Sequence, residues 1–301
     1  MISVPFFVRM MACPFGWSVC ARGRRSGKMS RPPEVFVPED MIAFYKELLG
    51  ITPDEGTVRA APPGPEEKKQ WEAGVPLLLV APPSVDTAAF FALLRRVADA
   101  AVKHNPGLAQ DVTQVLEALP ADPVEQEMFV ASVLSREGTR LEQLVRDAHL
   151  SPETLGFLVN HALKPIMRAY AQEAAGWCNT EEWQRGICPV CGGRPSLAIL
   201  EKEVGRRYLY CGLCETRWRY KRIGCPFCET EAPDGQEFFT LEGNDKYRIY
   251  VCSTCRGYLK TIDERRAGEE EIDLFWEDIG TVHLDILAMR EGYVNRSLEP
   301  V

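Results

Sequence analysis

The chain has 301 residues, of which 46% are hydrophobic, and carries 35 Lys plus Arg against 43 Asp plus Glu, a formal net charge of -8. This length and composition suit a soluble globular protein with two domains of ordinary size. The acidic balance argues against general binding to nucleic acid or anionic membranes, and the lack of an apolar run of ~20 residues argues against an integral membrane protein.

The first 28 residues are apolar and aromatic at their start and basic at their end. A secretory signal has the opposite order, with its positive charge first, so we do not expect this segment to direct export. Met29 begins a more polar stretch. We therefore interpret residues 1–28 as a disordered leader or an over-extended translation start. Its two cysteines, Cys13 and Cys20, receive no metal or redox role.

Residues 29–184 are expected to form an all-α domain. Apolar side chains recur at helical spacing along this region, and Ser151 followed by Pro152 is typical of a helix start. Pro165 should kink the last helix. Residues 52–76, rich in proline, glycine and charge, are expected to form a loop. The expected helices cover residues 41–49, 86–104, 108–118, 123–136, 139–148 and 152–175.

Three histidines, His104, His149 and His161, lie in this helical region. None has a carboxylate or cysteine at a recognisable ligand spacing along the chain, so we interpret them as surface or core side chains. The sequence also lacks a glycine-rich phosphate loop, a nucleophile elbow and a zinc-protease helix. It therefore predicts no catalytic residue, no organic cofactor and no enzyme.

The composition changes at Trp177, after which short β-branched and aromatic runs lead into or out of cysteine pairs. We expect a first metal ribbon over residues 185–223 and a second over 224–262. Residues 263–301 should form a charged linker and one C-terminal helix that ends near Gly292. The predicted fold class is α+β.

Eight of the eleven cysteines form four Cys-x-x-Cys pairs within 68 residues. Two intervening residues allow a tight turn that aims both sulfur atoms at one tetrahedral ion. Such clustering in a chain without a signal indicates metal ligation in a reducing compartment, which favours the cytoplasm. The predicted ligands are Cys188, Cys191, Cys211, Cys214, Cys225, Cys228, Cys252 and Cys255.

The grouping of these pairs stays open at this point. Sequential grouping joins the first pair with the second and the third with the fourth, whereas interleaved grouping joins the first with the third. We favour the sequential form because each half then contains its own strand-rich insert. Tetrahedral four-sulfur geometry suits both iron and zinc, so two ions are predicted and their identity is left undecided. Cys178 has no partner pair and is interpreted as an inert thiol.

A basic group lies on both sides of the second cysteine pair. Residues 185–262 carry 13 Lys plus Arg and 9 Asp plus Glu, a net of +4, which two ions with four thiolates each would bring to about zero. We favour this charge-balancing role over a nucleic-acid patch with stacking aromatic side chains. The basic residues are Arg206, Arg207, Arg217, Arg219, Lys221 and Arg222, and the aromatic ones are Tyr208, Tyr210, Trp218 and Tyr220.

Four segments together resemble the FdhE family of formate dehydrogenase accessory proteins. They are RYLYCGLCETRW from Arg207, CPFC from Cys225, CRGYLK from Cys255 and REGY from Arg290. The resemblance covers about residues 186–297, whereas the region before Trp177 is similar in layout more than in motif.

The resemblance implies a cytoplasmic, non-catalytic maturation factor. Such a protein engages the catalytic subunit of a respiratory formate dehydrogenase before twin-arginine export, and its four-cysteine centres are rubredoxin-like. The metal-ligand role carries over to all eight paired cysteines, but no motif identifies the residues that contact the partner. Two other functions stay open: a zinc-ribbon nucleic-acid binder and an iron-dependent electron carrier. The sequence leaves self-association undecided.

Overall fold

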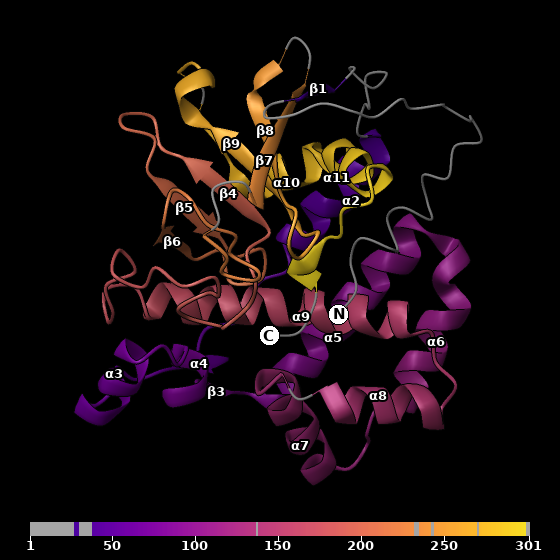
Figure 1. The fold of residues 1–301 in the computed structure, drawn as a ribbon. Coiled ribbons are helices and arrows are strands. Elements are labelled where there is room, and N and C mark those ends of the chain that lie inside the picture. Colours follow the sequence, from indigo (N-terminus) through magenta and orange to yellow (C-terminus); the bar gives the residue numbers. More distant parts are fainter. Residues whose placement is uncertain are drawn as a thin grey trace. The chain divides into compact units, whose positions relative to one another are not determined.

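The structure is a computed structural model that describes residues 27–29, 38–136, 138–231, 235–241, 244–269 and 271–298. These residues divide into two compact units (Figure 1). The helical unit contains the described residues 38–178, and the sheet unit contains 27–29 and 179–298. This arrangement confirms the predicted α+β class, while the finer segment boundaries stay predictions.

The helical unit is built mainly from α-helices, with one short two-stranded sheet. Its strands are β2 (Val58–Arg59) and β3 (Ser84–Val85), which pair antiparallel, and a 3₁₀ turn, η1, spans Pro106–Leu108. Its helices are α2 (Glu39–Leu49), α3 (Pro65–Glu72), α4 (Leu77–Val80), α5 (Thr87–His104), α6 (Ala109–Ala118), α7 (Pro123–Leu134), α8 (Gly138–Asp147) and α9 (Pro152–Glu173).

Side-chain caps begin several of these helices. Asp86 accepts a hydrogen bond from the Ala89 N–H at 2.8 Å at the start of α5, and Ser151 Oγ accepts one from the Thr154 N–H at 3.2 Å at the start of α9. The core between α5 and α9 includes the fully buried Phe90. Local capping and an apolar stripe together explain why these two helices match the sequence prediction.

The segment expected to be a loop contains secondary structure instead. Residues 52–76 include β2 and α3, and α3 begins with Pro65 at its first position while the Glu67 carboxylate accepts from the Gly64 N–H. Trp71 anchors α3 because its side chain is only 4% exposed. The prediction of a structureless loop was wrong because one aromatic anchor outweighs an otherwise polar composition.

The sheet unit contains one seven-stranded sheet in the order β1-β7-β8-β9-β4-β5-β6. Each metal ribbon supplies three antiparallel strands, and the parallel pairing of β4 with β9 joins the two ribbons. The strands are β1 (Gly27–Met29), β4 (Leu197–Leu200), β5 (Arg207–Tyr210), β6 (Arg217–Tyr220), β7 (Gln236–Leu241), β8 (Asn244–Cys252) and β9 (Tyr258–Asp263). The ribbons are therefore two halves of one sheet.

The segment interpreted as a leader lies mostly outside the described residues. Residues 1–26, with Cys13 and Cys20, are in that part of the chain. Gly27 and Lys28 instead belong to β1, which pairs parallel with β7. The proposal of a leader or an over-extended start therefore stays a prediction for residues 1–26.

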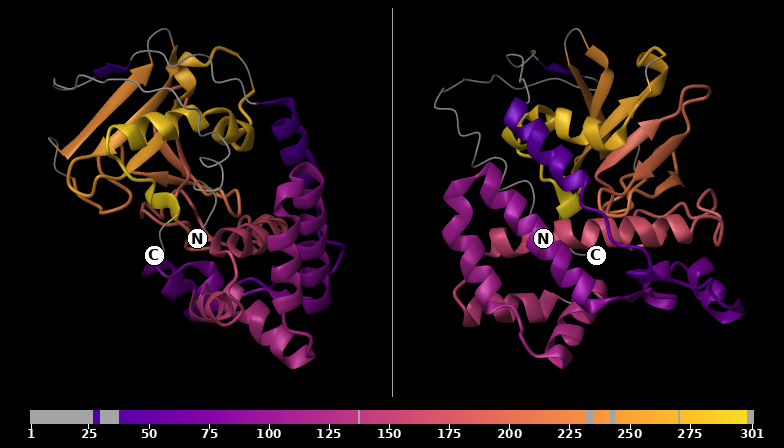
Figure 2. Two further views of the ribbon diagram at one scale, coloured as in Figure 1. Left: turned by 90° about the vertical axis from the view of Figure 1, so that its right-hand side faces the viewer. Right: turned by 180° about the vertical axis from the view of Figure 1, so that it is seen from behind.

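The single expected C-terminal helix is two helices, α10 (Leu274–Gly280) and α11 (Val282–Arg290), flanked by the 3₁₀ turns η3 (Glu264–Arg266) and η4 (Arg296–Leu298). They lie along one face of the strands (Figure 2). Leu284 and Ala288 of α11 pack in one buried cluster with Ile249 and Val251 of β8. None of the helices in the described ranges combines the length and apolar character that a membrane crossing requires.

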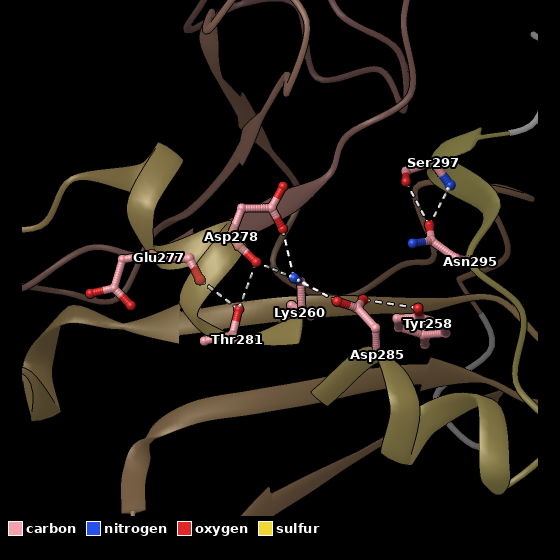
Figure 3. Close-up of polar contacts among 8 residues, drawn as sticks. All are labelled: Tyr258, Lys260, Glu277, Asp278, Thr281, Asp285, Asn295 and Ser297. Atoms are coloured by element: carbon pink, nitrogen blue, oxygen red, sulfur yellow. Dashed lines mark hydrogen bonds and ion pairs between the residues drawn. The ribbon is translucent and has the colours of Figure 1, made fainter. Parts of the chain in front are cut away.

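A buried ionic network attaches α10 and α11 to β9 (Figure 3). The Lys260 Nζ lies 2.6 Å from Asp278 Oδ1 and 2.8 Å from Asp285 Oδ2, and the Tyr258 hydroxyl donates to Asp285 Oδ1 at 2.9 Å. Burial disfavours the Lys260 charge, but the two carboxylates raise its pKa above the ordinary value. The network therefore satisfies three buried polar side chains at once.

Candidate metal centres

All four cysteine pairs adopt the same tight turn, which we call a knuckle. In each, the N–H of the first cysteine donates to the carbonyl five residues later, at 2.8–3.0 Å. The residue after the second cysteine has a positive φ. These residues are Gly192 at 71°, Glu215 at 62°, Glu229 at 57° and Arg256 at 57°. The repeated backbone explains why each pair points both sulfur atoms to the same side.

Two glycines near the sulfur atoms have different roles. Gly192 has a positive φ, whereas Gly212 does not. A Cβ on Gly212 would instead lie 2.9 Å from the Ser196 Oγ. Gly212 is therefore required for close approach of a side chain.

The first centre contains Cys188, Cys191, Cys211 and Cys214. The Sγ atoms of Cys188 and Cys214 are 3.5 Å apart, and those of Cys191 and Cys211 are 3.4 Å apart. All four side chains are buried, with at most 2% exposed. The sheet unit thus encloses four thiols in one water-poor site.

The second centre contains Cys225, Cys228, Cys252 and Cys255. The Sγ pairs Cys225–Cys255 and Cys228–Cys252 are each 3.7 Å apart. Cys225 and Cys252 are buried, Cys255 is half-buried and Cys228 is exposed. The structure therefore brings the pairs together sequentially, as favoured from the sequence, and leaves one cysteine of the second centre exposed.

Both clusters fit a tetrahedral ion. Sulfur ligands about 2.3 Å from such an ion lie about 3.8 Å from one another, and within each cluster all four Sγ atoms lie within 4.8 Å of one another. Burial also raises the pKa of Cys188 well above its ordinary value and raises the pKa of Cys225. Four thiols held this close together cannot all ionise without a compensating cation, so each donor set is suited to a metal.

Backbone amides support the thiolate form of several cysteines. The Gly193 N–H donates to Cys191 Sγ and the Gly257 N–H donates to Cys255 Sγ, each at 3.4 Å. Around Cys225, the N–H groups of Cys228 and Phe227 oppose the rise in pKa that burial causes. Such hydrogen bonds stabilise ligating sulfur, as the knuckle geometry predicts.

Arg207 is a buried cation beside the second centre. Its side chain lines a small cavity with Cys225 and Cys252, and its guanidinium carbon lies 5.7 Å and 5.3 Å from the ring centroids of Tyr220 and Tyr250. Its Nε is buried and without a hydrogen-bond partner in the part of the chain that the structure describes. A centre with one divalent ion and four thiolates carries a net charge of -2, half of which this cation would offset.

The other residues of the suspected nucleic-acid patch mostly have partners within the chain. Arg206 pairs with Glu201 at 3.1 Å, and Lys221 pairs with Glu231 at 2.5 Å. The four aromatic side chains that stacking would require, Tyr208, Tyr210, Trp218 and Tyr220, are at most 9% exposed. Buried rings cannot stack on bases, so this geometry disfavours a nucleic-acid patch here.

The histidines of the helical unit make structural contacts. His104 Nε2 lies 2.8 Å from the Glu47 carboxylate, a partner 57 residues away that sequence spacing did not reveal. The His161 Nδ1 donates to the Phe157 carbonyl at 2.9 Å. Cys178 is half-buried and belongs to neither cluster. These contacts are consistent with the interpretation of surface and core roles.

Known proteins are similar to this chain, and one family match covers the first centre. Residues 187–222 match the family described as FdhE, central domain. The chain is 34% identical to an FdhE homologue of Aquifex aeolicus over 148 residues, 48% of this chain and 51% of that protein. It is 32% identical to FdhE of Escherichia coli over 120 residues, 39% of this chain and 38% of that protein. The chain thus spans about half, or less, of the length of these curated relatives.

A solved structure is similar over a larger part of the chain. The crystal structure of the FdhE protein from Pseudomonas aeruginosa matches with a TM-score of 0.58 and 24% identity, and the match covers 85% of each chain. This likeness concerns the fold, whereas the family match, over residues 187–222, contains the four cysteines of the first centre. Because the family match lies on the first centre and two curated FdhE proteins are 32–34% identical to parts of the chain, the chain belongs to the FdhE family.

Proposed function

We propose that this protein is a cytoplasmic accessory factor for the assembly of a respiratory formate dehydrogenase, whose catalytic subunit it binds before twin-arginine export. The observation that supports this function is the pair of four-cysteine clusters in a chain of the FdhE family.

We further propose that all eight clustered cysteines ligate metal, one ion to each cluster. Each cluster offers four sulfur donors, which is the closed arrangement typical of structural sites and leaves no open position for substrate. A bound ion would stabilise the knuckles, and the amides and Arg207 described above would balance the thiolate charge. The protein is therefore proposed to act by binding a partner, without catalysis.

The proposed function is tested in the host by deletion of the gene. Formate dehydrogenase activity and the assembled enzyme should both be lost, and the intact gene supplied in trans should restore them. A matched control is a Cys178→Ser copy, which leaves both clusters complete and should also restore activity. Normal activity after deletion, without a second copy of the gene, would contradict the proposal.

Binding of the partner is tested separately. Tagged protein should co-purify with the formate dehydrogenase catalytic subunit from cells in which twin-arginine export is blocked. Co-purification at the level of an unrelated tagged protein would contradict this part of the proposal.

One observation favours a second candidate function, an iron-dependent electron carrier. The exposed Cys228 would give electrons a short path between solvent and an iron ion in the second centre. Protein purified without oxygen should then show visible absorption that a strong reductant bleaches reversibly. A colourless protein that contains zinc would exclude this function.

A further inference from the structure

The knuckle that carries Cys225 and Cys228 is held by residues of the other metal ribbon. We call residues 224–228 the third knuckle. The Arg207 Nη1, from β5 of the first ribbon, donates to the Gly224 carbonyl at 2.9 Å, and the Tyr220 hydroxyl, from β6, donates to the Cys225 carbonyl at 3.1 Å. Both donors are at most 2% exposed, so water does not compete for these bonds.

The next two carbonyls of the third knuckle also contact the first ribbon. Gly186 lies so close to the Pro226 carbonyl that a Cβ on residue 186 would overlap its oxygen. The Arg194 Nη1 donates to the Phe227 carbonyl at 3.1 Å. Four consecutive carbonyls, of residues 224 to 227, therefore each contact a group of the first ribbon.

These contacting groups lie close along the chain to the ligands of the first centre. Gly186 precedes Cys188 by two residues, and Arg194 follows Cys191 by three. Gly193, which lies between Cys191 and Arg194 in the chain, donates its N–H to Cys191 Sγ. The backbone that aims the first-centre sulfurs is thus continuous with the backbone and side chains that hold the third knuckle.

We propose that metal binding at the two centres is energetically coupled, so that an ion in the first centre raises the affinity of the second. This inference rests on the proposed metal binding. An ion at the first centre orders Gly186 and Arg194, and the third knuckle then meets a preformed surface and loses less conformational freedom when it binds its own ion. Because coupling between two sites is reciprocal, the second ion raises the affinity of the first by the same factor.

The first experiment measures zinc affinity of the full-length protein without oxygen, by competition with a chromophoric chelator. Wild-type protein should bind two ions. The variant Cys188→Ser/Cys211→Ser lacks the first centre, and its remaining site should bind zinc about 5- to 150-fold more weakly than the second site of the wild type, the range usual for coupled sites. The variant Cys228→Ser/Cys252→Ser should weaken the first site by the same factor.

The second experiment uses variants that keep all eight cysteines. A lower zinc affinity caused by unfolding is then not mistaken for a loss of coupling. Arg194→Ala removes the bond to the Phe227 carbonyl, and it should weaken the second site in the wild type but have little further effect in the variant without a first centre. Arg217→Ala is the control, because Arg217 is partly exposed and pairs with Glu264 at 3.7 Å. Far-UV circular dichroism confirms that each variant is folded.

The outcomes separate this inference from the proposed function. If each site keeps its wild-type zinc affinity after the other site is removed, the proposed coupling is overturned and the proposed metal binding stands. An Arg194→Ala variant with unchanged affinity at both centres would also overturn it. Wild-type protein that binds no zinc and no iron would overturn the proposed metal binding itself, and with it the coupling.

Discussion

The Nζ of Lys260 lies 2.8 Å from Oδ2 of Asp285, and the two side chains are only 6% and 5% exposed. The pair joins the strand β9 to the helix α11, and Asp278 of α10 is a second carboxylate partner of Lys260. Removal of one member leaves an uncompensated buried charge, which is among the more costly changes that a single substitution makes.

Substitution of Lys260 by methionine should therefore destabilise the sheet unit by about 3–5 kcal/mol, because Asp285 would be buried without its cation. The measurement is urea unfolding of the metal-loaded protein followed by tryptophan fluorescence. Lys202→Met is the control, since Lys202 is exposed and its Nζ donates to the Gly268 carbonyl at 3.0 Å. Equal stability of the two variants would contradict a role for the network.

Substitution of Gly186 by alanine should disturb the contact between the two ribbons. The new Cβ would overlap the Pro226 carbonyl oxygen, so backbone must move on one side, at a cost of about 1–3 kcal/mol. We expect a lower midpoint of urea unfolding and faster loss of zinc to a chelator. Gly280→Ala is a matched control because nothing lies within 4 Å of its Cβ position. A Gly186→Ala protein as stable as this control would show that the close approach is not required.

Removal of metal by excess chelator should unfold the sheet unit, since metal binding contributes about 10–16 kcal/mol in small zinc-binding folds and a whole domain is stable by only about 5–15 kcal/mol. Trp183 and Trp218 report on this change, because their indole N–H groups donate to the carbonyls of Ile187 and Arg185, just before the first cysteine. Near-UV circular dichroism of these rings should be lost on chelation and restored by zinc. Spectra that are unchanged after complete metal removal would contradict a structural role for the ions.

The helical unit should lose stability as the pH falls. Burial lowers the pKa of His161 from its ordinary value of 6.5 to about 4, against the hydrogen bond that its Nδ1 donates to Phe157. Between pH 6.5 and about 4 the unfolded chain binds a proton that the folded unit does not, so stability is full above pH 6.5 and falls below it. At 1.36 kcal/mol for each pKa unit, the loss is up to about 3 kcal/mol.

Urea unfolding at pH 7.0, 5.5 and 4.5, followed by circular dichroism at 222 nm, measures this loss. The variant His161→Phe should remove much of the difference between the three curves. His149→Asn serves as the control, because His149 is exposed and its positive φ of 52° is one that asparagine tolerates. An unchanged pH dependence in His161→Phe would assign the loss to other groups.

The features that the sequence predicted are those that depend on near neighbours. The helix cap of Ser151 and the Cys-x-x-Cys spacing are local, and both appear in the structure as expected. The C-terminal helix was predicted as one because its apolar pattern is continuous, but α10 ends at Gly280 and the backbone leaves helical geometry at Thr281, with φ -106° and ψ 19°. A change of backbone angles at a single residue leaves no mark on an apolar pattern.

The features that the sequence missed depend on residues far apart in the chain. Arg207 was grouped with five other basic residues in one charge-balancing set, and the sequence did not show that it alone of the six is buried, at 2% exposed, and held by Gly224 and two tyrosine rings. Nothing in the spacing marks it, because a buried arginine and a surface arginine have the same chemistry until their neighbours are known. The contact between His104 Nε2 and the Glu47 carboxylate was missed for the same reason.

The parallel pairing of β4 with β9 has a consequence for synthesis of the protein. β9 lies between β8 and β4 in the sheet, yet it is the last of the strands to leave the ribosome. A nascent chain that ends before Tyr258 has an unpaired edge on β4 and another on β8, and such edges recruit strands from other chains. Translation of six residues, Tyr258–Asp263, covers both edges at once. A pause or truncation just before this strand should therefore be the point at which the growing protein most needs protection from aggregation.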